Sequence, residues 1–238
     1  VLELGGKGIP LPDIAIPALL PGQEVLLDDG KLLLRVTEQT ETGAVAEVLR
    51  GGVLRGRKSL ALPGADLEPP TMTASDVENI RVAASCGVTG VMQPFVRSRR
   101  DLETVRRALD ENGGANIRLF AKIENQMGLE RLPEFLETAD EIVIARGDLG
   151  NAMPLWELPR CQKQLSAACR AAGVPFMVVT QMLDSMHTRA VPTRAEVSDI
   201  YNAVLDGASS LMLTGETAVG QYPVQAMEYL VRTARTAM

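Results

Sequence analysis

The chain of 238 residues is long enough for one large domain, or for one domain with a smaller companion. Hydrophobic residues make up 46% of it and aromatic residues only 3%, so the core must be built from aliphatic side chains. The net charge of −6 argues against a nucleic-acid partner, and no apolar run approaches the roughly 20 residues of a membrane span. Reduced thiols and a cytoplasmic location are expected, because there is no signal-peptide pattern and no metal spacing among Cys86, Cys161 and Cys169.

Residues 1–62 are predicted to form a small all-β unit, because short strand-like pieces alternate with Gly and Pro. Asp28-Asp29-Gly30 is a turn sequence, and its flanks at residues 24–27 and 32–36 predict a β-hairpin. Residues 42–49 and 58–60 continue the strand pattern. The unit closes with a basic run that fits a solvated loop and an anion-facing edge equally well: Arg50, Arg55, Arg57 and Lys58.

After a proline-rich linker at residues 62–70, apolar strands alternate with amphipathic helices. The predicted strands are residues 88–96, 117–123, 141–145, 175–180 and 209–213. The predicted helices are residues 73–85, 101–112, 128–138, 158–172, 193–206 and 223–237. Strands with continuous apolar runs are typical of a parallel sheet covered on both faces. The fold class is therefore α/β, as an open sheet or as part of a (β/α)8 barrel, since five units do not close such a barrel.

Polar residues follow each predicted strand at the point where it ends. Lys122 and Glu124 follow the second strand, Arg146, Gly147 and Asp148 follow the third, and Thr180 follows the fourth. Because the carboxyl ends of parallel strands share one edge, this is where ligands and chemistry are expected.

Two acids from neighbouring strands, Glu124 and Asp148, are expected to lie side by side with Lys122 beside them. Mg²⁺ takes few protein oxygens and completes its shell with water or phosphate, so this pair suits it. Lys122 offers a point charge for a transferring phosphoryl group. A salt bridge between these acids and Lys122 or Arg146 explains the same residues equally well.

Gly147 and Thr180 are the further candidates at this edge. Gly147 would let a ligand carboxylate approach backbone N–H groups where the chain enters a helical turn. Thr180 supplies a hydroxyl, which fits either a strand-end cap or a catalytic group.

A set of motifs is similar to the pyruvate kinase family, in order and at matching spacing. They are Lys122-Ile-Glu-Asn, Ala145-Arg-Gly-Asp-Leu-Gly, Thr180-Gln-Met-Leu-Asp-Ser-Met, Pro192-Thr-Arg-Ala-Glu, Asn202-Ala-Val-Leu-Asp-Gly and Leu213-Thr-Gly-Glu-Thr-Ala. The resemblance runs from about residue 23 to the C-terminus. It implies that residues 1–62 are most of the family's β-barrel lid domain, and that residues 63–238 are units four to eight of its TIM barrel.

The resemblance also implies an activity: phosphoryl transfer from phosphoenolpyruvate to ADP, giving pyruvate and ATP in glycolysis. Lys122 would stabilise the transferring phosphoryl group, and Glu124 and Asp148 would hold Mg²⁺ or Mn²⁺. Gly147, Asp148 and Thr180 would contact the substrate, with Thr180 near the proton delivered to the enolate carbon. Lys58 would contact the nucleotide. The family's K⁺ is also implied, with ligands in the first three barrel units, outside this chain.

Two other functions fit parts of the pattern. One is a catalytically incomplete relative that binds phosphoenolpyruvate and Mg²⁺, and the other is a metal-dependent enolate lyase or aldolase. The lid and Lys58 argue against a lyase, which has no need for a nucleotide lid. An unpaired strand at residues 88–92 would leave a bare hydrogen-bonding edge, so a homo-oligomer is expected.

Overall fold

The computed structural model describes residues 1–238 apart from Arg57, Asp66 and Glu68, and the chain divides into two compact units. The first comprises Val1–Pro70 with Gly150–Leu155, and the second comprises Thr71–Leu149 with Trp156–Met238. Arg57 of the expected basic run, and two acids of the expected linker, lie outside the described residues. The domain boundary at residue 62 stays a prediction.

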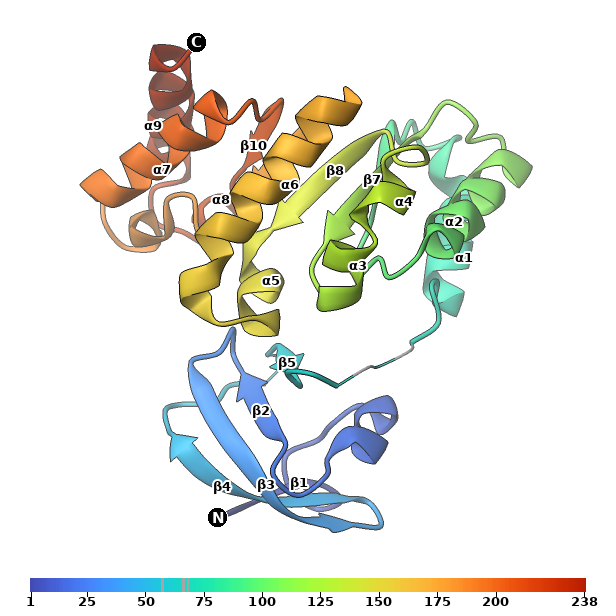
Figure 1. The fold of residues 1–238 in the computed structure, drawn as a ribbon, viewed down its shortest axis with the longest axis vertical. Helices are drawn as coiled ribbons and strands as arrows, with labels where there is room; N and C mark the ends of the chain where they lie inside the picture. Colours follow the sequence, from blue (N-terminus) through green and yellow to red (C-terminus); the bar gives the residue numbers. More distant parts are fainter. Residues whose placement is uncertain (57, 66, 68) are drawn as a thin grey trace. The chain divides into compact units, whose positions relative to one another are not determined.

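The first unit contains a five-stranded antiparallel sheet in the order β1-β4-β3-β2-β5 (Figure 1). Alternate residues of β3 are buried, so one face of the sheet covers the core of the unit. A short 3-10 helix, η1 (Asp13–Ala18), was not expected. The strands are β1 (Leu2–Gly5), β2 (Glu24–Leu27), β3 (Leu32–Thr40), β4 (Gly43–Arg50) and β5 (Leu60–Ala61).

The predicted hairpin is confirmed, since Leu27 of β2 pairs with Leu32 of β3. The turn between them carries positive φ at three successive residues, 51° at Asp28, 55° at Asp29 and 77° at Gly30. Gly adopts this region freely and Asp tolerates it better than most residues. The turn sequence therefore fixes the pairing register of the two strands.

The second unit is built on a parallel sheet whose strands are neighbours in chain order, β10-β9-β8-β7-β6. The predicted parallel sheet is thus confirmed. Within the described residues β6 and β10 each have one partner strand, so the sheet is open. The strands are β6 (Gly90–Gln93), β7 (Arg118–Ile123), β8 (Glu141–Ala145), β9 (Phe176–Val179) and β10 (Ser210–Met212).

Helices connect these strands, and α6 lies over β8 (Figure 1). Thr73 and Thr193 begin their helices with capping boxes, and Gly173 ends α6 at a φ of 69°. The elements are α1 (Ala74–Ala83), α2 (Arg99–Glu111), α3 (Gln126–Glu130), α4 (Leu132–Phe135), α5 (Arg146–Ala152), η2 (Leu155–Glu157), α6 (Leu158–Ala172), η3 (Asp184–His187), α7 (Arg194–Leu205), α8 (Gly215–Ala218) and α9 (Pro223–Thr236).

Two predicted elements were wrong in extent. The helix expected at residues 128–138 is two short pieces, α3 and α4, interrupted at Arg131. Pro133 explains the break, because its ring and its missing N–H prevent a continuous helix. The strand expected at residues 88–96 is only β6, because Pro94 follows it and Phe95 takes a φ of 49°.

One face of the parallel sheet carries a thin apolar layer. Val143 and Ala145 of β8 pack there against Val179 of β9. Lys122 pairs in register with Val143, so its side chain starts from this same face near the carboxyl end of β7. The layer therefore covers this face of the sheet next to the polar residues at the strand ends.

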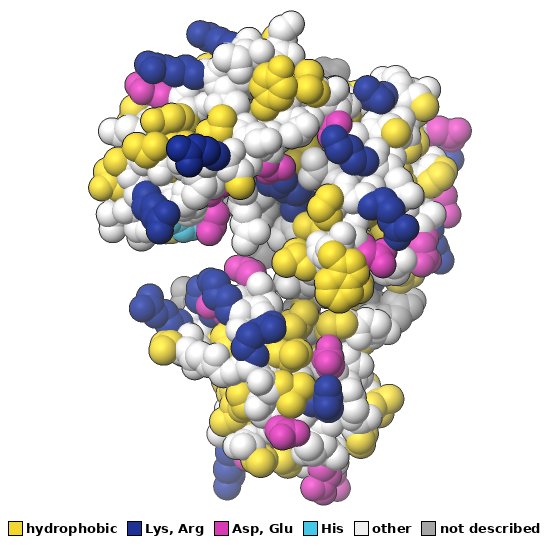
Figure 2. All heavy atoms as spheres, turned by 60° about the vertical axis from the view of Figure 1, so that its left-hand side comes forward, with side chains coloured by type: hydrophobic (Ala, Val, Ile, Leu, Met, Phe, Trp, Pro, Cys, Tyr) yellow, Lys and Arg dark blue, Asp and Glu magenta, His cyan; other side chains and the backbone are white. Residues whose placement is uncertain are grey.

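On the molecular face drawn in Figure 2, acidic and basic side chains are interspersed with hydrophobic ones.

The cysteines offer a direct check of this packing. Cys161 and Cys169 are buried in α6, whereas Cys86 is exposed. Burial raises the pKa of both α6 thiols, that of Cys169 to about 12. At about pH 8, iodoacetamide should therefore modify one thiol in the native chain and all three in urea, because the thiolate is the nucleophile. Mass spectrometry measures the count, and rapid native modification of all three would contradict this packing.

Candidate active site

The carboxyl end of β7 carries a close ion pair. Lys122 Nζ lies 2.7 Å from Glu124 Oε1, with side chains that are 24% and 1% exposed respectively. A carboxylate this deeply buried needs a charged or hydrogen-bonding partner. Lys122 supplies it, so the salt bridge that the sequence left open is present in the structure.

The second oxygen of Glu124 is also held. Glu124 Oε2 accepts a hydrogen bond of 2.8 Å from the backbone N–H of Phe95, in the loop after β6. Phe95 has a φ of 49°, which is uncommon for an aromatic residue and must be stabilised by its surroundings. Glu124 therefore ties the ends of β6 and β7 together, and its own orientation is fixed from both sides.

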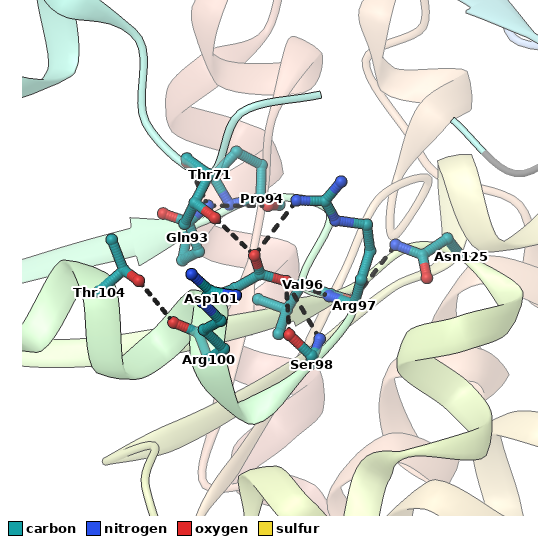
Figure 3. A network of polar contacts seen from close by, with 10 residues as sticks. All are labelled: Thr71, Gln93, Pro94, Val96, Arg97, Ser98, Arg100, Asp101, Thr104 and Asn125. Carbon is teal, nitrogen blue, oxygen red and sulfur yellow. Dashed lines mark hydrogen bonds and ion pairs between the residues drawn. The ribbon is translucent and has the colours of Figure 1, made fainter. Parts of the chain in front are cut away.

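A second buried acid, Asp101 of α2, holds the same loop (Figure 3). Asp101 Oδ2 accepts from the backbone N–H groups of Arg97 at 2.9 Å and Ser98 at 3.0 Å. Asp101 Oδ1 accepts from the Thr71 hydroxyl at 2.6 Å and from the Arg97 guanidinium at 3.2 Å. Burial on its own would raise the pKa of Asp101. These hydrogen bonds lower it by more than burial raises it, so the pKa of Asp101 lies below its usual value.

Glu124 and Asp148 follow neighbouring strands. Ile123 pairs with Ile144, so Glu124 is level with Ala145 at the end of β8, and Asp148 lies just beyond in the first turn of α5. Both carboxylates thus belong to the carboxyl-terminal edge of the sheet. Their role as a metal site stays a proposal.

The donor set of these two acids fits one kind of metal better than another. Among the described residues, no group of three or more His, Cys, Asp or Glu side chains is arranged to hold a metal alone. Such closed sites are typical of structural zinc. Mg²⁺ and Mn²⁺ instead accept one or two carboxylates and take their other oxygens from water and phosphate. Glu124 and Asp148 suit that second pattern.

Gly147 and Thr180 are brought together by the structure. A Cβ atom at Gly147 would lie 2.8 Å from Thr180 Cγ2, closer than van der Waals contact allows. The glycine thus makes room for the threonine methyl group. Thr180 itself has a φ of 79° and Gln181 a φ of 55°, so the end of β9 is a second strained segment at this edge.

Arg146 is a further polar residue at this edge, and the sequence did not indicate the contacts that it makes. Its guanidinium donates to the Thr180 carbonyl, at 3.2 Å from Nε and 2.8 Å from Nη2. Its Nη1 donates to Asp199 of α7 at 2.6 Å. No local pattern indicates this contact, because Asp199 lies 53 residues further along the chain.

Lys58 lies in the first unit and forms an ion pair there, with its Nζ 3.0 Å from Asp28 Oδ1. The Lys58 ammonium lowers the pKa of that carboxyl, and Lys31, 3.4 Å from Asp28 Oδ2, acts in the same direction. The hairpin turn is thus held next to β5.

None of the helices in the described part of the chain combines the length and the hydropathy that a membrane crossing requires.

Five parallel strands in chain order, with acids, a lysine and a threonine at one edge, are what part of a (β/α)8 barrel would show. The family model described as "Pyruvate kinase, barrel domain" matches residues 12–227. The chain belongs to the pyruvate kinase family. The predicted fold class, a partial barrel with a small β lid, is confirmed.

Relatives from distant organisms share this similarity. "Pyruvate kinase" from Agrobacterium vitis is 41% identical over 232 residues, 96% of this chain and 47% of the relative. "Pyruvate kinase PKLR" from Homo sapiens is 44% identical over 216 residues, 91% of this chain and 38% of the relative. "Pyruvate kinase 2" from Saccharomyces cerevisiae is 40% identical over 220 residues, 92% and 43% of the two chains. The chain spans less than half the length of these relatives, and the similarity does not favour a lyase.

Asp101 offers a test of the loop network. Asp101→Asn should lower the free energy of unfolding near neutral pH by about 1–3 kcal/mol, because buried backbone donors lose a charged acceptor. The pKa of Asp101 is lowered by folding, so its contribution is present above the unfolded-state pKa and is lost as pH falls through the folded one. The difference between the two proteins should therefore shrink below about pH 4.

Urea titrations at a series of pH values measure this difference. Asp110→Asn, which removes an exposed acid from the same helix, is the matched control. Equal effects of the two substitutions would contradict a special role for Asp101.

Proposed function

We propose that this chain is the lid and part of the catalytic barrel of a pyruvate kinase. In this proposal it takes part in transferring a phosphoryl group from phosphoenolpyruvate to ADP, which gives pyruvate and ATP in glycolysis. Membership of the family supports the proposal. The observation that carries it is the ion pair of Lys122 and Glu124 at the carboxyl end of β7, beside the first turn of α5 with Asp148.

Lys122 is proposed to stabilise the transferring phosphoryl group. Phosphoryl transfer needs positioning and charge neutralisation more than covalent chemistry, and an ammonium supplies a compact positive charge. Glu124 holds the ammonium at 2.7 Å and is itself held by the Phe95 N–H. The charge is therefore fixed in place before substrate arrives, which avoids reorganisation during the reaction.

Glu124 and Asp148 are proposed to hold Mg²⁺ or Mn²⁺. When bound, the metal would neutralise phosphate and carboxylate charge on the substrate. Each carboxylate oxygen has more than one lone pair, so Glu124 can keep its bonds to Lys122 and Phe95 and still bind a cation. K⁺ is also proposed, with ligands outside this chain.

Gly147 and Thr180 are proposed to contact the substrate, together with Lys122 and Asp148. Loss of the phosphoryl group from phosphoenolpyruvate leaves an enolate, which must gain a proton at carbon. A hydroxyl acting through water delivers such a proton, and Thr180 supplies a hydroxyl at this edge. The contact of Gly147 with the Thr180 methyl group supports placing both residues in one site.

Lys58 is proposed to contact the nucleotide, as its motif implies. Its ion pair with Asp28 supports a lysine held in one orientation on the hairpin side of the lid. A homo-oligomer is also proposed. A glycolytic role and three free cysteines support a cytoplasmic location.

Lys122 gives the main test. In a lactate dehydrogenase-coupled assay of the protein made from the complete gene, Lys122→Met should lower kcat by about 100- to 1,000-fold, because one fixed charge is lost from the transition state. Chelation of divalent metal should abolish turnover of the unaltered protein.

Lys163→Met is the control, since Lys163 is half-exposed and pairs with Asp206, which is not among the proposed site residues. Circular dichroism checks that Lys122→Met folds, because removing one partner of a buried pair destabilises a protein. Equal turnover of Lys122→Met and the unaltered protein would remove the role given to Lys122. Calorimetric binding of phosphoenolpyruvate with Mg²⁺, without turnover, would instead indicate an incomplete relative.

Gly147 gives an independent test. Gly147→Ala should lower kcat/KM by about 10- to 100-fold, because the new methyl group displaces the Thr180 side chain. Thr180→Ser removes the methyl group that would clash and keeps the hydroxyl, so the double variant should recover part of the loss. Absence of any recovery would show that the collision with Thr180 is not the cause.

A further inference from the structure

Thr180 has a strained backbone conformation that needs stabilising contacts. Its φ is 79°, and the next residue, Gln181, has a φ of 55°. A β-branched residue rarely takes a positive φ, because its Cβ atom then crowds its own backbone. Such strain persists only where neighbouring contacts over-determine it. The contacts of the Thr180 peptide therefore decide where its hydroxyl lies.

Arg146 makes two of these contacts. Two nitrogens of its guanidinium, Nε and Nη2, donate to the Thr180 carbonyl at 3.2 and 2.8 Å. Arg146 directly follows β8, and Thr180 directly follows β9, its neighbour in the sheet. The planar fork of the guanidinium thus joins the ends of two adjacent strands and fixes the orientation of the carbonyl.

The guanidinium is itself held on its other edge. Nη1 lies 2.6 Å from Asp199 Oδ2 of α7 and 3.5 Å from Gln162 Oε1 of α6, while Nη2 lies 3.0 Å from Met182 Sδ. The Arg146 side chain is only 11% exposed. A buried arginine that is hydrogen-bonded on both edges is held in one side-chain conformation. Arg146 therefore connects α7 rigidly to the Thr180 carbonyl.

The same stretch of chain also fixes the Thr180 side chain. Gly147 follows Arg146, and a Cβ atom on it would come within 2.8 Å of Thr180 Cγ2. The methyl group is therefore packed against Gly147. Within the described part of the chain the Thr180 hydroxyl makes no hydrogen bond, which leaves it for an outside group.

We infer that Arg146 is a positioning residue for the proton-transfer half of the reaction, with Asp199 as the residue that holds it. This inference rests on the proposed pyruvate kinase function. In that half-reaction a C–H bond forms at the enolate carbon as an O–H bond of the water or hydroxyl breaks, and solvent then returns the proton. Arg146 touches none of the reacting atoms. It holds the Thr180 peptide so that the hydroxyl stays where the proton is needed.

Two rates separate this role from general folding. One is kcat for phosphoryl transfer in the coupled assay, and the other is the rate at which pyruvate methyl protons exchange with D₂O in the presence of Mg²⁺, followed by NMR. The exchange reports the proton step alone. The variants are Arg146→Lys, which keeps the charge but loses the fork, and Asp199→Asn, which loses the charge that holds it. Lys163→Met is the control, because it breaks the 2.6 Å pair with Asp206 between α6 and the end of α7.

Arg146→Lys should slow methyl exchange and kcat by about 10- to 100-fold, because a small displacement of a catalytic group is expensive. KM for phosphoenolpyruvate should change less than about twofold, since binding contacts remain. Asp199→Asn should show a smaller loss of the same kind. The control should stay within about twofold of the unaltered protein in both rates.

Near-normal methyl exchange in Arg146→Lys would overturn the inference, and so would an equal loss in the control. Amide hydrogen exchange of residues 180–183 supplies a readout that does not depend on catalysis. It should be faster in Arg146→Lys than in the unaltered protein or the control. If the unaltered protein does not turn over, the proposed function fails, and unchanged amide exchange in Arg146→Lys would separately overturn the positioning role.

Discussion

The buried carboxylate of Glu124 is the constraint on which the rest of the site depends. Nearly all of its side chain is removed from water, so both oxygens must be satisfied by the protein. One is satisfied by the ammonium of Lys122 and the other by the N–H of Phe95. Phe95, whose N–H meets the second requirement, has a positive φ, and the Asp101 network holds the residues that follow it in the same loop. A single acid thus determines the position of a charge on one strand and the path of the chain after another.

The same principle operates one strand further along. The carbonyl of Thr180 receives the Arg146 guanidinium, and here too a strained residue at a strand end is held by a charged side chain from the neighbouring segment. Strained residues in folded proteins cluster at functional sites and persist where the surrounding structure holds them. Two such residues at the same edge of the parallel sheet support the proposal that this edge is the active site.

Much of this arrangement could be predicted from the sequence, because its causes are local. The run at residues 141–145 is apolar after Glu141 and is the strand β8, and the helix at residues 158–172 ends at Gly173 as expected. The polar residues after each strand could be placed at one edge since parallel strands share a direction. What could not be predicted depends on partners distant in the chain. Phe95 lies 29 residues from Glu124, Asp199 lies 53 from Arg146, and no periodicity reports such pairs. The break at Arg131 was not predicted, because the apolar spacing of residues 128–138 is that of one helix and only Pro133 indicates an interruption.

The order of strands in the parallel sheet bears on how the protein is made. Each strand from β7 to β10 lies beside the one synthesised just before it. As the chain leaves the ribosome, each strand after β6 can therefore pair at once with the strand synthesised before it. Short sequence separation between partners favours rapid folding, and chains that fold from the N-terminus during translation expose less unpaired edge. Each added strand covers the edge of the strand before it, which shortens the time for which that edge is exposed in the nascent chain.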